Sequence, residues 1–187
     1  MEKEDHTILW ILMLGFALFI SLIYDHSLLR AITSSRSVLL SFYFIQFARI
    51  FTVPVIIGVI TLFLLRQRKL IVPWLITAVT VLFFTLALKA FISQPRPYIR
   101  YDDIIALTRE SLYSFPSTRT AIAFSSLPLL AKYFPRFFPF WIFFALLIAF
   151  SRLYLGVHFV SDIAGGILLG YFIGKMIVMS TERTSRA

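Results

Sequence analysis

The chain has 187 residues, of which 59% are hydrophobic, 17% aromatic and 14% charged. Soluble domains are about one quarter charged, so the composition excludes a soluble protein and predicts an integral membrane protein that forms one domain over residues 1–187. The net charge is +9, but the basic residues lie between apolar runs instead of in one patch. This pattern favours anionic lipid head groups as partners over nucleic acid. The chain has no cysteine, which excludes disulfides and thiol chemistry.

The apolar runs predict six membrane-spanning helices joined by short loops, since a span needs roughly 17–25 mostly apolar residues. The first run has mixed charges before it and no small-residue cleavage site after it, so we expect an anchor and not a signal peptide. The second run is too long for one span and is divided into an interfacial helix near Ser37–Phe47 and a span. The fold class is therefore predicted to be all-α, a polytopic six-helix bundle. Its spans are Thr7–Tyr24, Arg49–Leu65, Leu70–Ser93, Ser117–Phe134, Phe138–Leu155 and Phe159–Met179.

Lysine and arginine near the span ends predict the orientation. Four basic residues are set aside as functional candidates: Lys89, Arg96, Arg119 and Arg152. With the N-terminus inside, nine of the others fall on the cytoplasmic side and five on the outer side. This bias predicts that both termini are cytoplasmic, in the inner (plasma) membrane. The outer five are expected to be interface anchors: Arg30, Arg36, Arg49, Arg100 and Arg109.

Three polar segments, LKAFISQPRPY, SFPSTRT and SRLYLGVHFVSD, then meet on the periplasmic or extracellular face. A charged group inside a span costs about 2.5–3.5 kcal/mol, so the four cations set aside are functional candidates. With few acids nearby in the sequence they would repel one another. A phosphate group with about two negative charges would remove that repulsion, and arginine's planar fork suits phosphate oxygens.

Two further features indicate phosphoryl transfer. Ser117 follows Pro116 and is predicted to open a helix, where its hydroxyl and the first free N–H groups can hold an anionic oxygen. His158 and Asp162 are four residues apart, and if the last helix begins near Val157 they share one face. The carboxylate then fixes one imidazole nitrogen and leaves the other free to attack phosphorus.

The residues Lys89-x6-Arg96-Pro97, Pro116-Ser117 and Ser151-Arg152-x5-His158-x3-Asp162 resemble the three-part signature of the type 2 phosphatidic acid phosphatase (PAP2) family. This family is one branch of a superfamily that includes the vanadium haloperoxidases. The resemblance implies dephosphorylation of a membrane lipid phosphate without a metal or other cofactor. It implies that His158 is the nucleophile and that Asp162 orients it. The implied phosphate-binding residues are Lys89, Arg96, Ser117 and Arg152.

The second motif departs from the family pattern. Family members usually read Pro-Ser-Gly-His, where the histidine protonates the leaving oxygen, but here Ser117 is followed by Thr118 and Arg119. Arginine stays protonated and cannot do that job well. Either another group such as His26 supplies the proton, or the leaving group needs little protonation and Arg119 stabilises its charge as a catalytic residue. The second explanation favours lipid A 1-phosphate, then undecaprenyl diphosphate, over phosphatidic acid or phosphatidylglycerol phosphate.

Other functions stay open at this point. The missing motif histidine is also compatible with an inactive relative that binds anionic lipid. A phosphotransferase remains possible, because these motifs do not encode the acceptor of the phosphoryl group. A transporter or channel is disfavoured, because the cytoplasmic halves of the spans look uniformly apolar. The sequence leaves the oligomeric state open, and we expect Tyr98, Tyr154 and Asp102–Asp103 to be ordinary loop residues.

Overall fold

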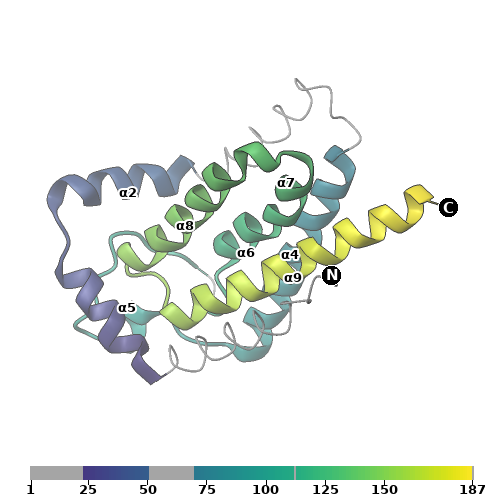
Figure 1. The fold of residues 1–187 in the computed structure, drawn as a ribbon. Coiled ribbons are helices and arrows are strands. Elements are labelled where there is room, and N and C mark those ends of the chain that lie inside the picture. The colour runs from purple at the N-terminus through teal and green to yellow at the C-terminus, as the bar shows by residue number, and fades with distance from the viewer. Residues whose placement is uncertain (1–22, 51–69, 112, 187) are drawn as a thin grey trace.

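The structure, a computed structural model, describes residues 23–50, 70–111 and 113–186 (Figure 1). Within these ranges all regular structure is helical, which confirms the predicted all-α class. The predicted spans Thr7–Tyr24 and Arg49–Leu65 lie almost entirely outside the described residues. A helix over Ile23–Ser34 comes first. It is followed by α2 (Val38–Ile50), α4 (Ile71–Ile92), α5 (Pro97–Arg100), α6 (Thr118–Ser125), α7 (Leu127–Tyr133), the 3-10 helix η2 (Pro135–Phe137), α8 (Phe138–Tyr154) and α9 (Val160–Arg186).

Three stretches of this part of the chain are long and apolar enough to cross a membrane: Ile71–Arg100, Pro135–Tyr154 and Val160–Thr181. They correspond to three of the predicted spans. A fourth candidate is the pair Ile23–Ser34 and Val38–Ala48, which is bent by 114° at its break. The second member of that pair falls in α2, so the helix predicted near Ser37–Phe47 is present.

The single span predicted over Ser117–Phe134 is wrong in detail, because the structure has two short helices there. α6 ends at Ser125, Ser126 separates the two helices, and α7 begins at Leu127. Pro128 lies in the first turn of α7. Proline has no N–H and its ring clashes with the carbonyl four residues earlier, so it is tolerated at a helix start and breaks a helix that runs through it.

The most extensive helix–helix contact in the described ranges joins α6 to α9. It depends on glycines spaced four residues apart on α9, which let the two backbones approach closely, as small residues do in membrane bundles. A Cβ atom on Gly170 would lie 2.1 Å from the backbone oxygen of Ala121, and one on Gly174 would lie 2.1 Å from that of Ser125. Neither position therefore accepts a larger residue without moving a helix.

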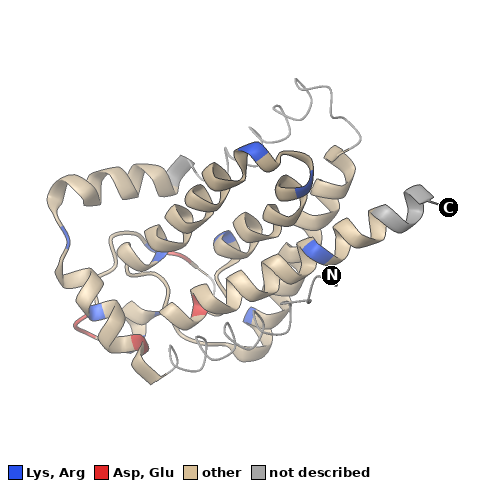
Figure 2. Cartoon of the chain, in the orientation of Figure 1, with Lys and Arg blue, Asp and Glu red and all other residues tan. Residues whose placement is uncertain are grey.

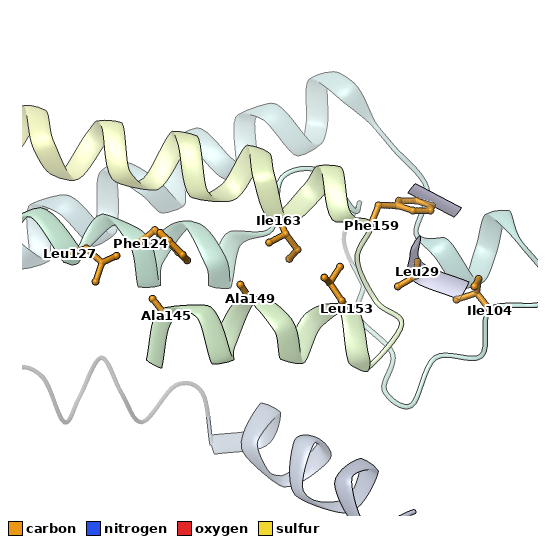
Figure 3. Packing of buried hydrophobic residues seen from close by; sticks show 9 residues of the cluster. All are labelled: Leu29, Ile104, Phe124, Leu127, Ala145, Ala149, Leu153, Phe159 and Ile163. Carbon is orange, nitrogen blue, oxygen red and sulfur yellow. The ribbon is translucent and has the colours of Figure 1, made fainter. Parts of the chain in front are cut away.

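A buried apolar cluster fixes the positions of α6, α8 and α9 (Figure 3). Side chains of the three helices point toward one another, and the Ile23–Ser34 helix and the loop after α5 close one end of the cluster. Its members are Leu29, Ile104, Phe124, Leu127, Ala145, Ala149, Leu153, Phe159 and Ile163. Because Phe159 and Ile163 flank the start of α9, the core holds that end of the helix in place.

Arg36, predicted to be an interface anchor, instead ties three segments together. Its Nε atom donates a hydrogen bond to the backbone oxygen of Tyr154 at 2.7 Å, and its Nη1 atom donates to that of Ile105 at 2.6 Å. The corner before α2 is thereby bound to the end of α8 and to the connection that follows α5.

Candidate active site

The predicted cations come from separate helices and, for Arg96, from the residue before α5, and they meet at one end of the bundle. Lys89 lies in the last turn of α4, Arg119 in α6 and Arg152 in the last turn of α8. Figure 2 shows basic positions on α6 and at the end of α8, with acidic positions nearby at the start of α9 and in the adjacent connection. The side chains of Arg96 and Arg152 are 3% and 1% exposed, and that of Arg119 is 34% exposed. The structure therefore brings these cations together.

An acidic residue that the sequence analysis missed lies at the centre of the cluster. The Oε1 atom of Glu110 is 2.7 Å from Nη1 of Arg119 and 3.1 Å from Nη1 of Arg152. Its Oε2 atom is 3.1 Å from Nη2 of Arg96 and 3.7 Å from Nε2 of His158. The sequence analysis expected few acids near these cations, and the connection between α5 and α6 brings one acid, Glu110, among them.

Glu110 is ionised at neutral pH. Its pKa falls from the usual value near 4.5 to about 2. Burial alone favours the neutral form, but the contact with His158 and the positive charges of Arg119 and Arg96 together outweigh it. The site therefore contains a carboxylate anion in the position where the sequence analysis expected a phosphate.

His158 and Asp162 are in contact, although not in the way predicted. A shared helix face required a helix that begins near Val157, but α9 starts at Val160, so His158 precedes the helix and Asp162 lies in its first turn. The Nδ1 atom of His158 is 3.1 Å from Oδ2 of Asp162. Because an ionised carboxylate only accepts hydrogen bonds, this contact places the imidazole proton on Nδ1. The Nε2 atom then carries the lone pair, and Nη1 of Arg96 lies 3.3 Å from it.

The same carboxylate of Asp162 is held by two further donors. The backbone N–H of Phe159 donates to Oδ2 at 2.7 Å, and the hydroxyl of Ser114 also donates to Oδ2. The bond from Phe159 is one half of a capping box, in which an acid in the first helical turn satisfies the N–H of the residue before the helix. Helix capping and histidine orientation thus use one carboxylate, and its position is set by the start of α9.

Two of the predicted phosphate-binding residues are engaged by the protein itself. The Nζ atom of Lys89 donates to the backbone oxygens of Tyr113 and Ser114 at 2.6 and 2.9 Å. Ser117 does precede α6, as predicted, but its hydroxyl accepts from the hydroxyl of Thr120 at 3.0 Å. Its backbone N–H donates to the backbone oxygen of Asp162 at 3.0 Å. In this structure Ser117 joins α6 to the start of α9.

A pocket of about 490 Å³ opens at the cation cluster. This volume has room for a phosphate group and for part of the molecule that carries it. Arg109, which we expected to be an interface anchor, is one of the lining residues. The others are Lys89, Arg96, Glu110, Ser111, Thr118, Arg119 and His158.

His26, the alternative proton source, is placed elsewhere. Its Nε2 atom is 3.0 Å from Oδ1 of Asp103, its ring stacks on that of Tyr101, and it is not among the residues that line the pocket.

Tyr98, expected to be an ordinary loop residue, contacts the site indirectly. Its hydroxyl donates to the backbone oxygen of Glu110 at 3.1 Å. No group of three or more metal-ligating side chains occurs within the described ranges.

The helical membrane fold and the arginine-lined site with its histidine and aspartate define a membrane protein whose site suits an anionic group. Comparison with known families shows which family has this architecture. The model of the PAP2 superfamily matches residues 69–186, which is more than half of the chain. The protein therefore belongs to the PAP2 superfamily, as the resemblance in the sequence suggested.

Relatives support this assignment. Phosphatidylglycerophosphatase B of Bacillus subtilis is 34% identical over 110 residues, which are 53% of this chain and 52% of that protein. The match thus spans about half the length of this curated relative. The crystal structure of LpxE from Aquifex aeolicus has a TM-score of 0.75 and 31% identity, covering 83% of this chain and 94% of that one. The transmembrane PAP2-type phosphatidylglycerolphosphate phosphatase of Bacillus subtilis has a TM-score of 0.75 and 26% identity, with 98% of each chain covered.

Proposed function

We propose that this PAP2 protein is a lipid phosphate phosphatase that works through a phosphohistidine on His158. The observation that carries the proposal is the His158–Asp162 contact of 3.1 Å beside three arginines that already hold an anion. The lipid's tails stay in the bilayer and its phosphate enters the pocket. No metal takes part in the proposed reaction, since arginine side chains supply the positive charge.

The reaction has two displacement steps at phosphorus. In the first, the lone pair of His158 Nε2 forms a bond to phosphorus while the bond from phosphorus to the lipid oxygen breaks, and that oxygen leaves with the electron pair. Asp162 stabilises the imidazolium that forms. In the second, a water oxygen attacks phosphorus and gives up one proton through the solvent to the departed lipid oxygen, while the phosphorus–nitrogen bond breaks, its electron pair returns to Nε2 and inorganic phosphate is released. Arg96, Arg119 and Arg152 stabilise the charge on the phosphoryl oxygens in both steps.

The substrate that this site favours is one whose leaving oxygen needs little protonation. Arg119 stands where the family has an acidic histidine, and His158 is the only histidine that lines the pocket in the described part of the chain. A simple alkoxide leaves poorly without an acid, whereas the anomeric oxygen of a sugar phosphate leaves more easily. We therefore propose lipid A 1-phosphate as the substrate, with undecaprenyl diphosphate as the next choice on the same reasoning.

Phosphatidylglycerol phosphate is a second candidate, and a different observation favours it. Both the curated protein from Bacillus subtilis and the solved structure from the same organism carry the name of a phosphatase of this lipid. Its phosphate is an alkyl monoester, so this substrate would require a proton donor other than Arg119.

A phosphate-release assay distinguishes these candidates. The detergent-purified protein is given lipid A, undecaprenyl diphosphate, phosphatidylglycerol phosphate or phosphatidic acid, with EDTA present, and His158→Ala is run beside it. We expect release from lipid A to be fastest and to vanish in the variant. If the protein releases phosphate from none of the four lipids, the phosphatase proposal is contradicted and an inactive lipid-binding protein is favoured.

The variant Arg119→His tests the leaving-group argument by restoring the family's acid. We expect it to raise kcat/KM on phosphatidylglycerol phosphate and phosphatidic acid by about 10²-fold, the lower end of the contribution of a general acid. The same change should give no gain on lipid A, because that leaving group needs little protonation. If the ratio of kcat/KM on alkyl phosphates to kcat/KM on lipid A is the same in Arg119→His as in the wild type, the leaving-group argument is contradicted. Arg119→Lys is the matched control, since it keeps a charge but adds no titratable acid near neutral pH.

A further inference from the structure

We propose that Glu110 is an internal substitute for the substrate phosphate: its carboxylate occupies the arginine cluster when the site is empty, and a lipid phosphate has to displace it. The inference rests on the proposed function, because it concerns the same site. It adds a residue outside the three motifs that controls how strongly the site binds phosphate.

The contacts of the carboxylate are those that a phosphate group needs. Each of its oxygens bonds to a guanidinium group, with Oε1 held by Arg119 and Arg152 and Oε2 held by Arg96, all at 2.7–3.1 Å. Charge-assisted bonds of this length are the strong ones, and arginine makes them equally to carboxylate and to phosphate oxygens. Glu110 therefore uses the donors that would otherwise bind the substrate.

The position of Glu110 also excludes a bound phosphate. Reacting atoms in a productive complex lie about 3–3.5 Å apart before the bond forms. The Oε2 atom of Glu110 lies 3.7 Å from Nε2 of His158, close to where the phosphorus atom has to come. The carboxylate and the phosphoryl group cannot both occupy this place, so substrate binding requires the Glu110 side chain to move.

The structure offers both an anchor for Glu110 and room for that movement. The hydroxyl of Tyr98 donates to the backbone oxygen of Glu110 and accepts from its backbone N–H at 3.4 Å, which fixes the main chain. The side chain is 20% exposed and lines the pocket of about 490 Å³, so it can turn outward. Displacement of the carboxylate is therefore compatible with an unchanged backbone.

Mass action gives the expected size of the effect. When the binding-competent state is only a fraction of the population, the apparent affinity falls by that fraction. If the seated carboxylate is favoured by about tenfold over the displaced one, its removal should tighten phosphate binding by about tenfold. If the carboxylate were purely structural, its removal would have the opposite effect. The arginines would repel one another, and the site would bind phosphate more weakly.

The experiment measures binding of inorganic phosphate and of orthovanadate to the detergent-purified full chain by isothermal titration calorimetry. We expect Glu110→Gln to lower the Kd about tenfold, and Glu110→Asp, whose shorter side chain cannot reach all three arginines, to lower it less. Asp103→Asn is the matched control, since it removes an acid of the same connection that pairs with His26 outside the pocket.

An unchanged or higher Kd in a folded Glu110→Gln protein would overturn the proposal. If that variant does not fold, Glu110→Asp decides in the same way. Because the readout is binding and not turnover, this result is independent of the phosphatase assay. A protein that releases no phosphate from any lipid but binds phosphate more tightly after Glu110→Gln would contradict the proposed function and leave the inference standing.

Discussion

At the scale of single residues, the site is organised around one carboxylate. Asp162 Oδ2 accepts hydrogen bonds from the His158 ring, from the backbone N–H of Phe159 and from the hydroxyl of Ser114. All three donors require an acceptor at this point, and the carboxylate oxygen of Asp162 supplies it. This arrangement fixes both the tautomer of the histidine and the direction of its lone pair.

Asp162→Asn tests this arrangement. An asparagine keeps the shape but turns one oxygen into a donor, so the histidine can take the wrong tautomer. We expect kcat to fall by about 10²- to 10⁴-fold with little change in KM. Steady-state kinetics on the preferred lipid measure both constants. Asp103→Asn serves as the control, and a loss of less than threefold in Asp162→Asn would contradict the orienting role.

The residue scale is also where prediction from sequence was most uneven. Lys89, Arg96, Arg152 and His158 stand at fixed spacings in ordered motifs, so their convergence could be predicted without a structure. Glu110 could not be found in this way, because it lies in an irregular connection with no periodic signal. The one available signal was physical: four converging cations need an anion, and Glu110 is the acid of the outer connection that lies nearest to the second motif.

At the scale of elements, the contact between α6 and α9 determines whether the site exists. It sets Ser117 at the start of α6 against the backbone oxygen of Asp162 in α9. Helix lengths followed from apolar runs, which is why α4, α8 and the start of α9 fall close to prediction. The break at Ser126 could not be predicted from the apolar run, because a proline near the middle of such a run is compatible with either a kinked span or two helices.

Gly170→Leu tests the contact between α6 and α9. Even a Cβ atom at this position would lie 2.1 Å from the backbone oxygen of Ala121, so the two helices have to separate. Overpacking of this kind costs about 1–3 kcal/mol. We expect a lower melting temperature in detergent and loss of most of the phosphatase activity, both measured on the same preparation. Phe172 also lies in α9 but is 60% exposed, so Phe172→Leu should leave the melting temperature and the activity unchanged. An unchanged melting temperature in Gly170→Leu would contradict the packing argument.

At the scale of the whole molecule, the site lies at one end of a helical membrane bundle, so substrate access depends on orientation. The bias of lysine and arginine predicts that both termini are cytoplasmic and that the site faces the periplasm or the exterior. The chain has no cysteine, so a single introduced cysteine is a unique label. Asp102→Cys, in the connection that carries Glu110, and Ser185→Cys, near the C-terminus, report on the two sides.

We expect a membrane-impermeant maleimide to label Asp102→Cys in intact cells, or in cells whose outer membrane alone has been opened. Ser185→Cys should react only after the cytoplasmic membrane is permeabilised. The opposite pattern would place the active site on the cytoplasmic side and would contradict the orientation predicted from charge.

The central claim is that His158 becomes phosphorylated during the reaction, and a trapping experiment tests it most directly. The purified protein is mixed with lipid labelled with ³²P at the phosphate, quenched in alkali within one turnover, and separated from free lipid. We predict label on the protein that survives alkali, is lost in acid as phosphoramidates are, and is absent from His158→Ala. Rapid phosphate release with no protein-bound label at any quench time would contradict the account and point to direct attack by water.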